Sequence, residues 1–282
     1  MRLTSLANDR VKLVRALQTQ RKAREKEARF VIEGVRLVEE ALGASALVDF
    51  AFYTAEADGR VRSALDRLRE RNVTLLEVSP SVMRACADTE HPQAVLAVVR
   101  YPLIPIPSPN GRGETGVRGN PLILICDRIS DPGNLGTLLR SAAAAGAAAV
   151  WLSPGTADAF NPKVVRAGMG AHFRLPIESL EWDTIRIRLE GMQILLAAAE
   201  YATGNTTSDK RQTLRYDLAD WTRPSALIIG SEAEGPTAAA HACATATVFI
   251  LMPGGSESLN AAIAGSVILF EVVRQRLVKR QT

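Results

Sequence analysis

The chain has 282 residues, of which 47% are hydrophobic and 23% charged, a core-forming balance that excludes a small disulfide-stapled scaffold. No apolar run reaches the roughly 18 residues needed to cross a bilayer, and the start lacks the apolar core of a signal peptide. The net charge is +4, and the three cysteines form no metal or disulfide pattern, so we expect a reducing, cytoplasmic compartment.

The first predicted element is a helix over residues 9–28, with apolar positions at Val11 and Leu17 and a charged outer face. Residues 1–29 carry nine basic side chains against three acidic ones, whereas the segment that follows is slightly acidic. A basic segment of this kind suits contact with phosphates, but a solvated helix face with intrahelical ion pairs would explain the same pattern. Charge alone leaves both interpretations open.

After an apolar run at residues 30–32, helix-like and strand-like patterns alternate as far as residue 99. Predicted helices cover residues 34–42, 59–71 and 81–87, and predicted strands cover residues 47–53, 73–78 and 94–99. The alternation predicts a compact α/β domain over residues 1–100, and no catalytic constellation is found in it.

Residues 101–120 interrupt this pattern with prolines at 102, 105, 107 and 109, followed by glycines at 111, 113, 116 and 119. Such a composition predicts a linker whose proline-rich half is extended and stiff and whose glycine-rich half is flexible. We therefore expect the two domains on either side to change their relative orientation.

A second alternation begins at residue 121, with predicted strands at 122–126, 148–152, 193–198, 226–229 and 247–251. These strands are continuous apolar runs, a pattern that predicts a parallel sheet covered by helices on both faces. The last predicted helix runs from about Leu259 to Arg276. Its apolar stripe is formed by Leu259, Ile263, Val267, Phe270 and Val273.

Three polar segments of the second domain lie where apolar runs stop, at residues 131–136 leading to Arg140, at 230–235 and at 258–260. Open α/β sheets bind ligands outside the carboxyl ends of their strands, so we expect these segments to meet at one edge. The nucleotide-binding fingerprints GxGxxG and GxxxxGKS/T are missing, which disfavours ordinary dinucleotide and nucleoside-triphosphate folds.

The same segments read Asn134-x-Gly136-x-x-x-Arg140, Gly230-Ser231-Glu232-x-x-Gly235 and Ile250-x-Met252-x-Gly254-x-x-x-Ser258-Leu259-Asn260. In order and spacing they resemble the three signature motifs of the SpoU/TrmH family of RNA 2′-O-ribose methyltransferases, in the SPOUT class. The third motif departs at Leu251, where the family usually has proline. The basic start, residues 30–34 and the turn at residues 91–93 are similar to the RNA-binding domain that many members carry.

The resemblance implies an α/β fold with a C-terminal SPOUT-type parallel sheet containing a deep trefoil knot. A smaller N-terminal α/β RNA-binding domain, similar to a ribosomal-protein fold, precedes it. The implied domains are residues 1–100 for RNA binding, 101–120 as linker and 121–282 for methyl transfer. S-adenosylmethionine would bind within the knotted loops, and a homodimer would complete the site. Periodicity gives no sign of a knot, which general topology rules make improbable.

Matching the motifs residue by residue implies site roles for Arg140, Asn134, Glu232, Ser258 and Asn260. The family arginine is credited with activating the 2′-hydroxyl. Because a guanidinium stays protonated, we expect Arg140 to grip the adjacent phosphate and stabilise the developing alkoxide. Simpler interpretations are a surface ion pair for Arg140, helix caps for the asparagines and serine, and a loop-bracing carboxylate for Glu232.

For the cofactor, the resemblance implies backbone contacts at Gly230, Ile250 and Leu259, with Met252 and Ala199 as neighbours. Outside the motif context, apolar side chains of this kind are more often core residues. Predicted RNA contacts in the first domain are Arg21, Lys22 and Arg24, which would position RNA without reading its sequence. The three histidines have no metal-ligand spacing, so we expect no metal.

The predicted function is transfer of a methyl group from S-adenosylmethionine to a ribose 2′-hydroxyl in structured RNA. A separate N-terminal binding domain favours 23S-type ribosomal RNA, with tRNA as the alternative substrate. Two other classes stay open, a non-catalytic RNA-binding or ribosome assembly factor and a small-molecule methyltransferase. The intact motif residues argue against the first and the basic N-terminal domain against the second. No membrane partner is expected.

Overall fold

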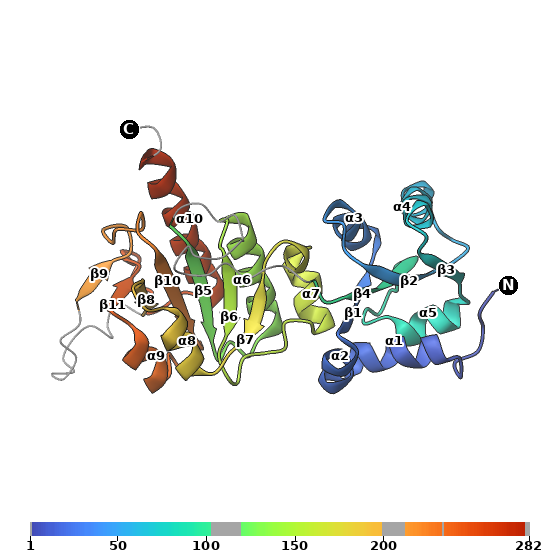
Figure 1. Cartoon of the computed structure of the whole chain (residues 1–282), viewed down its shortest axis with the longest axis horizontal. Helices are drawn as coiled ribbons and strands as arrows, with labels where there is room; N and C mark the ends of the chain where they lie inside the picture. The colour runs from blue at the N-terminus through green and yellow to red at the C-terminus, as the bar shows by residue number, and fades with distance from the viewer. Residues whose placement is uncertain (1, 103–119, 199–211, 233, 280–282) are drawn as a thin grey trace. The chain divides into compact units, whose positions relative to one another are not determined.

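The computed structural model describes residues 2–102, 120–198, 212–232 and 234–279 (Figure 1). By its internal contacts the chain forms two compact units. One contains Met1–Leu103 and Asp158–Arg174, and the other contains Ile104–Ala157 and Leu175–Thr282. A segment that the sequence places in the methyltransferase domain therefore packs with the N-terminal unit. Most of the expected linker lies outside the described residues.

The N-terminal unit is a four-stranded sheet in the order β1-β4-β2-β3 with helices on both faces. Its strands are β1 (Arg29–Glu33), β2 (Val48–Tyr53), β3 (Thr74–Glu77) and β4 (Val95–Arg100). Its helices are α1 (Asp9–Thr19), α2 (Arg21–Glu27), α3 (Val35–Gly43), α4 (Gly59–Glu70), α5 (Pro80–Cys86) and α7 (Pro162–Gly168), with a short 3-10 helix, η1 (Ala171–Phe173). Strand β4 pairs antiparallel with β1 and β2, while β3 pairs parallel with β2.

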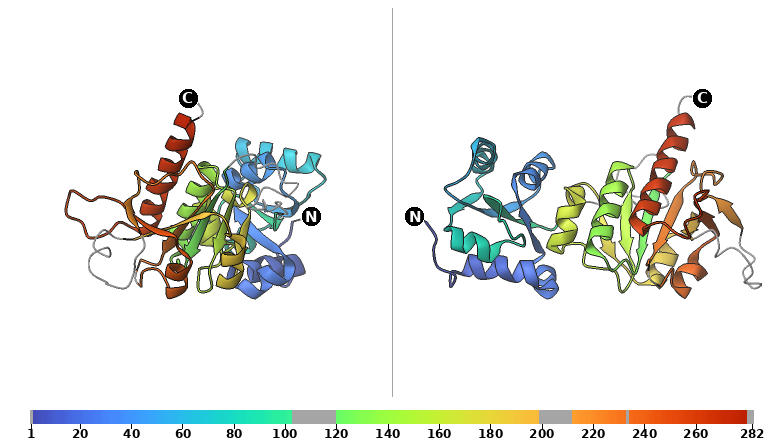
Figure 2. Two further views of the ribbon diagram at one scale, coloured as in Figure 1. Left: turned by 60° about the vertical axis from the view of Figure 1, so that its left-hand side comes forward. Right: turned by 180° about the vertical axis from the view of Figure 1, so that it is seen from behind.

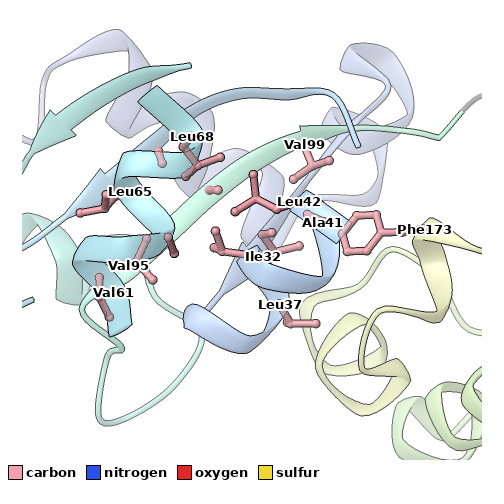
Figure 3. Close-up of a cluster of buried hydrophobic side chains, with 14 of the residues drawn as sticks. Ile32, Leu37, Ala41, Leu42, Val61, Leu65, Leu68, Val95, Val99 and Phe173 are labelled. Carbon is pink, nitrogen blue, oxygen red and sulfur yellow. The ribbon is translucent and has the colours of Figure 1, made fainter. Parts of the chain in front are cut away.

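Alternation along these strands produces two cores, one on each face of the sheet. Val31, Phe52 and Val98 pack with buried residues of α1 and α5. Ile32 and Val99 belong to the opposite cluster, which also holds the buried faces of α3 and α4. Phe173, from the segment that returns to this unit, lies at one edge of that second cluster (Figure 3).

The prediction of a single helix over residues 9–28 is wrong, because the helix is interrupted at Gln20. This residue is extended, with φ −120° and ψ 114°, and separates α1 from α2. The break brings Arg24 under the end of α1, where its guanidinium donates hydrogen bonds to the carbonyl oxygens of Leu17 (2.6 Å) and Gln18 (3.4 Å). Carbonyls at a helix C-terminus lack partners within the helix, so Arg24 satisfies them.

The second unit is a seven-stranded sheet in the order β7-β6-β5-β10-β8-β11-β9, and every neighbouring pair is parallel. Its strands are β5 (Leu122–Asp127), β6 (Ala149–Leu152), β7 (Ile177–Ser179), β8 (Gln193–Ala197), β9 (Thr213–Arg215), β10 (Ser225–Gly230) and β11 (Ala246–Phe249). The prediction of a parallel sheet is confirmed. The short edge strands β7 and β9 were not expected.

Helices cover both faces of this sheet. They are α6 (Pro132–Ala144), α8 (Trp182–Arg188), α9 (Ala238–Cys243) and α10 (Ala261–Lys279). Figure 1 shows α8 and α9 on the nearer face, and the right panel of Figure 2 shows α6 and α10 on the opposite face. Gly265 allows α10 to lie close to α6, because a Cβ atom there would stand 2.5 Å from Cδ2 of Leu138.

The apolar stripe expected on the last helix lies on its exposed side in this single chain. Ile263 is 53% exposed, Val267 36% and Phe270 51%. The buried face of the helix holds small and aliphatic residues together with one carboxylate, namely Ala261, Ala262, Gly265, Ile268, Leu269, Val272 and Glu271. Helix α10 is therefore largely apolar on both sides, and the apolar side chains of its outer side stay exposed among the described residues.

Candidate active site

The three polar motif segments meet at the carboxyl edge of the parallel sheet. The register places Asp127, the last residue of β5, beside Gly230, the last residue of β10. The loop after β5 (residues 128–131) and the loop after β10 (residues 231–237) therefore leave the sheet at the same level. The segment after β11 (residues 250–260) completes this edge and leads into α10.

Glu232 joins the three segments through one atom. Its Oε1 accepts hydrogen bonds from the side-chain amides of Asn134 (2.6 Å) and Asn260 (2.7 Å) and from the backbone N–H of Ala261 (3.0 Å). The Asn260 amide also donates to Oδ1 of Asn134, at 3.0 Å. The loop-bracing interpretation of Glu232 therefore fits this structure, because the carboxylate fixes the start of α10 to both other motifs.

The capping interpretation holds for Asn260 and fails for Asn134. Oδ1 of Asn260 accepts from the backbone N–H groups of Ala262 (3.0 Å) and Ile263 (3.1 Å), which caps α10. The N-cap of α6 is Asp131, whose carboxylate accepts from the backbone N–H of Asn134 at 2.7 Å. The side chain of Asn134 is thus free to contact Glu232. Ser258 caps no helix and makes no hydrogen bond to another described residue.

A pocket of about 200 Å³ opens beside this hydrogen-bonded cluster. The structure brings together there six of the predicted residues, which are Gly230, Glu232, Ile250, Met252, Ser258 and Leu259. Ala199 lies outside the described residues, while its neighbours Ala197 and Ala198 line the pocket. Sequence reasoning missed Pro236 and Ile268 in the lining. Pro236 could have been found from its position directly after the second motif.

Arg140 lies in the second half of α6, is exposed and does not line this pocket. No hydrogen bond or ion pair joins it to another described residue, so the surface ion-pair interpretation has no support here. Within one chain, the predicted catalytic arginine is therefore separate from the Asn134, Glu232 and Asn260 cluster.

Gly230 gives the pocket its shape, since a side chain at this position has no room. A Cβ atom built there would stand 2.7 Å from the backbone N and 2.8 Å from Cα of Pro236. Apolar residues, including Ile250 and Leu259, line the pocket beside Gly230. An apolar cleft with a few polar edges suits an adenosyl ligand, so the residues present fit the cofactor expected from the motifs.

Asp127 is a site residue that the motifs did not indicate. It is fully buried, and both of its oxygens are used: Oδ1 accepts from Ser153 Oγ (2.8 Å) and Oδ2 from the backbone N–H of Thr237 (2.7 Å). No described cation forms an ion pair with it. A buried carboxylate is costly unless hydrogen-bonded, so Asp127 is a tether that holds the loop after β10. An acid ending an apolar strand was the available signal.

The predicted RNA contacts in the N-terminal unit divide into two kinds. Arg24 is only 3% exposed and pairs with Asp158 at 2.5 Å, so its prediction as an RNA contact is wrong. Its guanidinium is committed to the interior of the unit. Arg21 and Lys22 are exposed, and Arg21 pairs with Glu25 on the same helix at 2.7 Å.

The described part of the chain was also compared with the requirements of metal sites, reactive thiols and membrane spans. No group of three or more His, Cys, Asp or Glu residues there could hold a metal ion. Cys86, Cys126 and Cys243 are free thiols, and burial raises the pKa of Cys86 to about 11. None of the helices in the described residues combines the length and hydropathy needed to span a bilayer.

Comparison with known proteins identifies the architecture built from these motifs. Residues 121–270 match the model of the SpoU rRNA methylase family. The chain belongs to that family. Residues 8–97 match a second model, described as an MRM3-like substrate binding domain. The SpoU match contains all three motif segments, so the resemblance seen in the sequence is confirmed.

The similarity to known proteins extends over nearly the whole chain. The mouse mitochondrial rRNA methyltransferase 3 is 33% identical over 96% of this chain and 73% of its own length. The 23S rRNA (guanosine(2553)-2′-O)-methyltransferase RlmP of Bacillus subtilis is 31% identical over 96% and 98%. An AdoMet-bound rRNA methyltransferase from Sinorhizobium meliloti is similar in structure, with a TM-score of 0.79, 28% identity and 97% coverage of both chains.

Proposed function

We propose that the protein transfers a methyl group from S-adenosylmethionine to a ribose 2′-hydroxyl of ribosomal RNA. One observation carries the proposal. Three separated motifs converge on Oε1 of Glu232, beside a pocket where only a glycine at position 230 leaves room for the backbone of Pro236. The names of the mouse and Bacillus relatives point to ribosomal RNA, and the Bacillus name also specifies 2′-O-methylation and 23S rRNA. A 23S-type substrate is accordingly favoured over tRNA.

The cofactor supplies an electrophilic methyl group on a sulfonium. Gly230, Ile250 and Leu259 line the pocket and would hold the adenosyl portion, with Met252 as a neighbour in the lining. Methyl transfer to an alcohol requires alignment, exclusion of water and removal of one proton, and little else from the protein. Glu232 and Asn260 act in alignment, since they fix the start of α10 against the pocket.

A homodimer completes the site in this proposal. The outer side of α10 exposes Ile263, Val267 and Phe270, and a second copy of the chain would cover them. Arg140 lies on α6, which packs against α10, and has no partner among the described residues of its own chain. We propose that Arg140 of one protomer serves the pocket of its partner, gripping the RNA phosphate beside the reacting hydroxyl.

The N-terminal unit contributes RNA affinity. Arg21 and Lys22 remain the proposed contacts, and they bind phosphates without reading the sequence. The trefoil knot that the family resemblance implies belongs to this proposal as well, as do the domain limits 1–100, 101–120 and 121–282. The cytoplasmic location expected from the sequence also stays a prediction.

The test is transfer of labelled methyl from S-adenosylmethionine to separate pools of unmodified ribosomal and transfer RNA, followed by mapping of 2′-O-methyl positions. We expect label in ribosomal RNA and none with the Arg140→Ala variant. Label in transfer RNA alone would replace the proposed substrate. A folded protein that binds the cofactor and labels neither pool would contradict the proposal.

A further inference from the structure

The three segments at the carboxyl edge of the sheet, which include part of the wall of the pocket, hold more acidic than basic side chains. The segments 128–136, 231–237 and 250–260 contain the acids Asp131, Glu232, Glu234 and Glu257, with a single cation, Arg128. RNA is a polyanion, and its phosphates approach a surface more favourably where cations neutralise them. Because Arg128 directly follows β5 at this edge of the sheet, its position bears directly on substrate binding.

The backbone of Arg128 adopts a conformation that side chains other than glycine rarely take. Its φ is +57°, in the left-handed region, which costs a residue with a Cβ atom roughly 1 kcal/mol. Two hydroxyl groups hold it there, because the Arg128 N–H donates to Ser153 Oγ (3.2 Å) and Thr156 Oγ1 (3.1 Å). Glycine would fit this position without strain, so the arginine side chain carries a conformational cost here.

The side chain of Arg128 is held at the surface. Gly155 provides the space, since a Cβ atom there would stand 3.3 Å from Cγ of Arg128. The Arg128 side chain is 45% exposed, its guanidinium pairs with the Glu234 carboxylate at 2.6 Å, and the Glu234 side chain is 60% exposed. An exposed pair of this kind contributes about 1 kcal/mol or less, so a phosphate can displace the carboxylate.

Two further contacts lie on either side of the loop after β5 and connect it to the loop after β10, which places Arg128 near the Glu232 cluster. Asp127 holds Thr237 at 2.7 Å at the buried base, and Asn134 holds Glu232 at 2.6 Å at the cluster. Arg128 follows Asp127 directly in the sequence, and Glu234 lies two residues from Glu232. The buried tether fixes the loops without help from Arg128, which leaves the exposed pair free to exchange partners.

We propose that Arg128 is an RNA-phosphate contact at the rim of the methyl-transfer site, held by Glu234 until RNA displaces that carboxylate. The inference rests on the proposed function for its substrate class. It adds a binding residue outside the three motifs, on the same chain as the pocket.

Arg128→Gly and Glu234→Gln are the matched variants. Arg128→Gly removes the guanidinium and also relieves the left-handed strain, so the folded protein should be at least as stable as the wild type. Glu234→Gln leaves Arg128 in place and removes its competitor. If Arg128 binds RNA, the two variants shift RNA affinity in opposite directions. If the pair only braces the loop, both variants weaken cofactor binding.

The measurements are the Kd for unmodified 23S-type ribosomal RNA over a salt series and the Kd for S-adenosylmethionine by calorimetry. For Arg128→Gly we expect a roughly tenfold higher RNA Kd and a salt slope smaller by about one, with the cofactor Kd within twofold. For Glu234→Gln we expect a lower RNA Kd, because the carboxylate that competes with the phosphate is removed. Unchanged RNA affinity and slope in Arg128→Gly, or weakened cofactor binding in both variants, would overturn the inference.

These binding measurements separate the inference from the proposed function. Methyl transfer by the wild type tests the reaction, whereas the comparison of variants tests Arg128 through RNA affinity whether or not transfer occurs. A wild type that methylates ribosomal RNA, with an Arg128→Gly variant of equal RNA affinity, would leave the function standing and reject the role of Arg128.

Discussion

The side-chain amide of Asn134 donates a 2.6 Å hydrogen bond to Oε1 of Glu232, a residue 98 positions later in the chain. This contact ties the start of α6 to the loop after β10. The same oxygen accepts from Asn260 and from the backbone of Ala261, so one atom orders three segments. Glu232 therefore holds the three segments together through hydrogen bonds to one oxygen atom, a role that a neutral carbonyl oxygen could also fill.

Substitution of Glu232 distinguishes bracing from proton transfer. Glu232→Gln keeps a carbonyl oxygen where the three donors converge, so we expect it to retain most of the methyl-transfer rate. Glu232→Ala leaves those donors without a partner, and we expect kcat/KM to fall roughly 10- to 100-fold. Steady-state kinetics with both substrates provide the comparison. Equal losses in the two variants would indicate that the carboxylate itself takes part in the reaction.

Gly230→Ala should damage the cofactor pocket specifically. A Cβ atom at this position meets backbone atoms of Pro236 at 2.7 and 2.8 Å, and backbone cannot move aside as a flexible side chain does. We expect the affinity for S-adenosylmethionine to fall at least about tenfold, as measured by calorimetry. Gly43→Ala is the control, because nothing lies within 4 Å of a Cβ atom there. Undiminished affinity in Gly230→Ala would be incompatible with the pocket assigned here.

Arg24→Ala should act on stability and not on RNA directly. Arg24 is buried, pairs with Asp158 at 2.5 Å and satisfies the end of α1. Removing one partner of a buried pair costs roughly 3–5 kcal/mol, which denaturant unfolding would measure. Lys22→Ala, on the exposed surface of α2, should change stability by about 0.5 kcal/mol or less while reducing the salt slope of RNA binding. The reverse pattern would restore Arg24 as an RNA contact.

His172 should make the N-terminal unit sensitive to acid. Burial lowers the pKa of His172 from 6.5 to about 4, although the hydrogen bond to Ala159 opposes the shift. Below pH 6.5 His172 is protonated in the unfolded chain but stays neutral in the folded state, so the free energy of unfolding falls as the pH decreases towards 4. Between about pH 7 and pH 5, the wild type should lose about 2 kcal/mol more than His172→Gln in denaturant unfolding. Parallel losses would contradict this.

Phe270→Glu should prevent dimer formation if the outer side of α10 is the interface. Phe270 is 51% exposed in the single chain, and a carboxylate there could not be buried against a second copy without a large cost. Sedimentation equilibrium should give the mass of one chain for this variant and of two for the wild type. Ile187→Glu is the control, since Ile187 is 64% exposed on α8, across the sheet from α10. A monomeric wild type would contradict the proposed dimer.

Sequence reasoning predicted the parallel sheet and the convergence of the motifs, because continuous apolar strands and the turns after them are local patterns. It failed where tertiary contacts decide the outcome. The first helix is interrupted at Gln20, and Arg24 beyond the interruption pairs with Asp158, a partner 134 positions away that no local pattern could indicate. The outer stripe of α10 was recognised as apolar, but periodicity cannot tell which apolar side of a helix packs within its own chain. Asp127 went unnoticed because its partners are a distant hydroxyl and a backbone N–H.

The packing of residues 158–174 in the N-terminal unit has a consequence for synthesis and for dissection of the protein. The cluster around Ile32 and Leu42 includes Val165 and Phe173, and Arg24 needs Asp158. The first unit therefore cannot complete its core on the ribosome until residue 174 has emerged, by which time β5 and β6 have been made. A fragment ending near residue 100 would expose apolar surface and a buried arginine. A fragment to which residues 158–174 are covalently joined should fold as the isolated N-terminal unit.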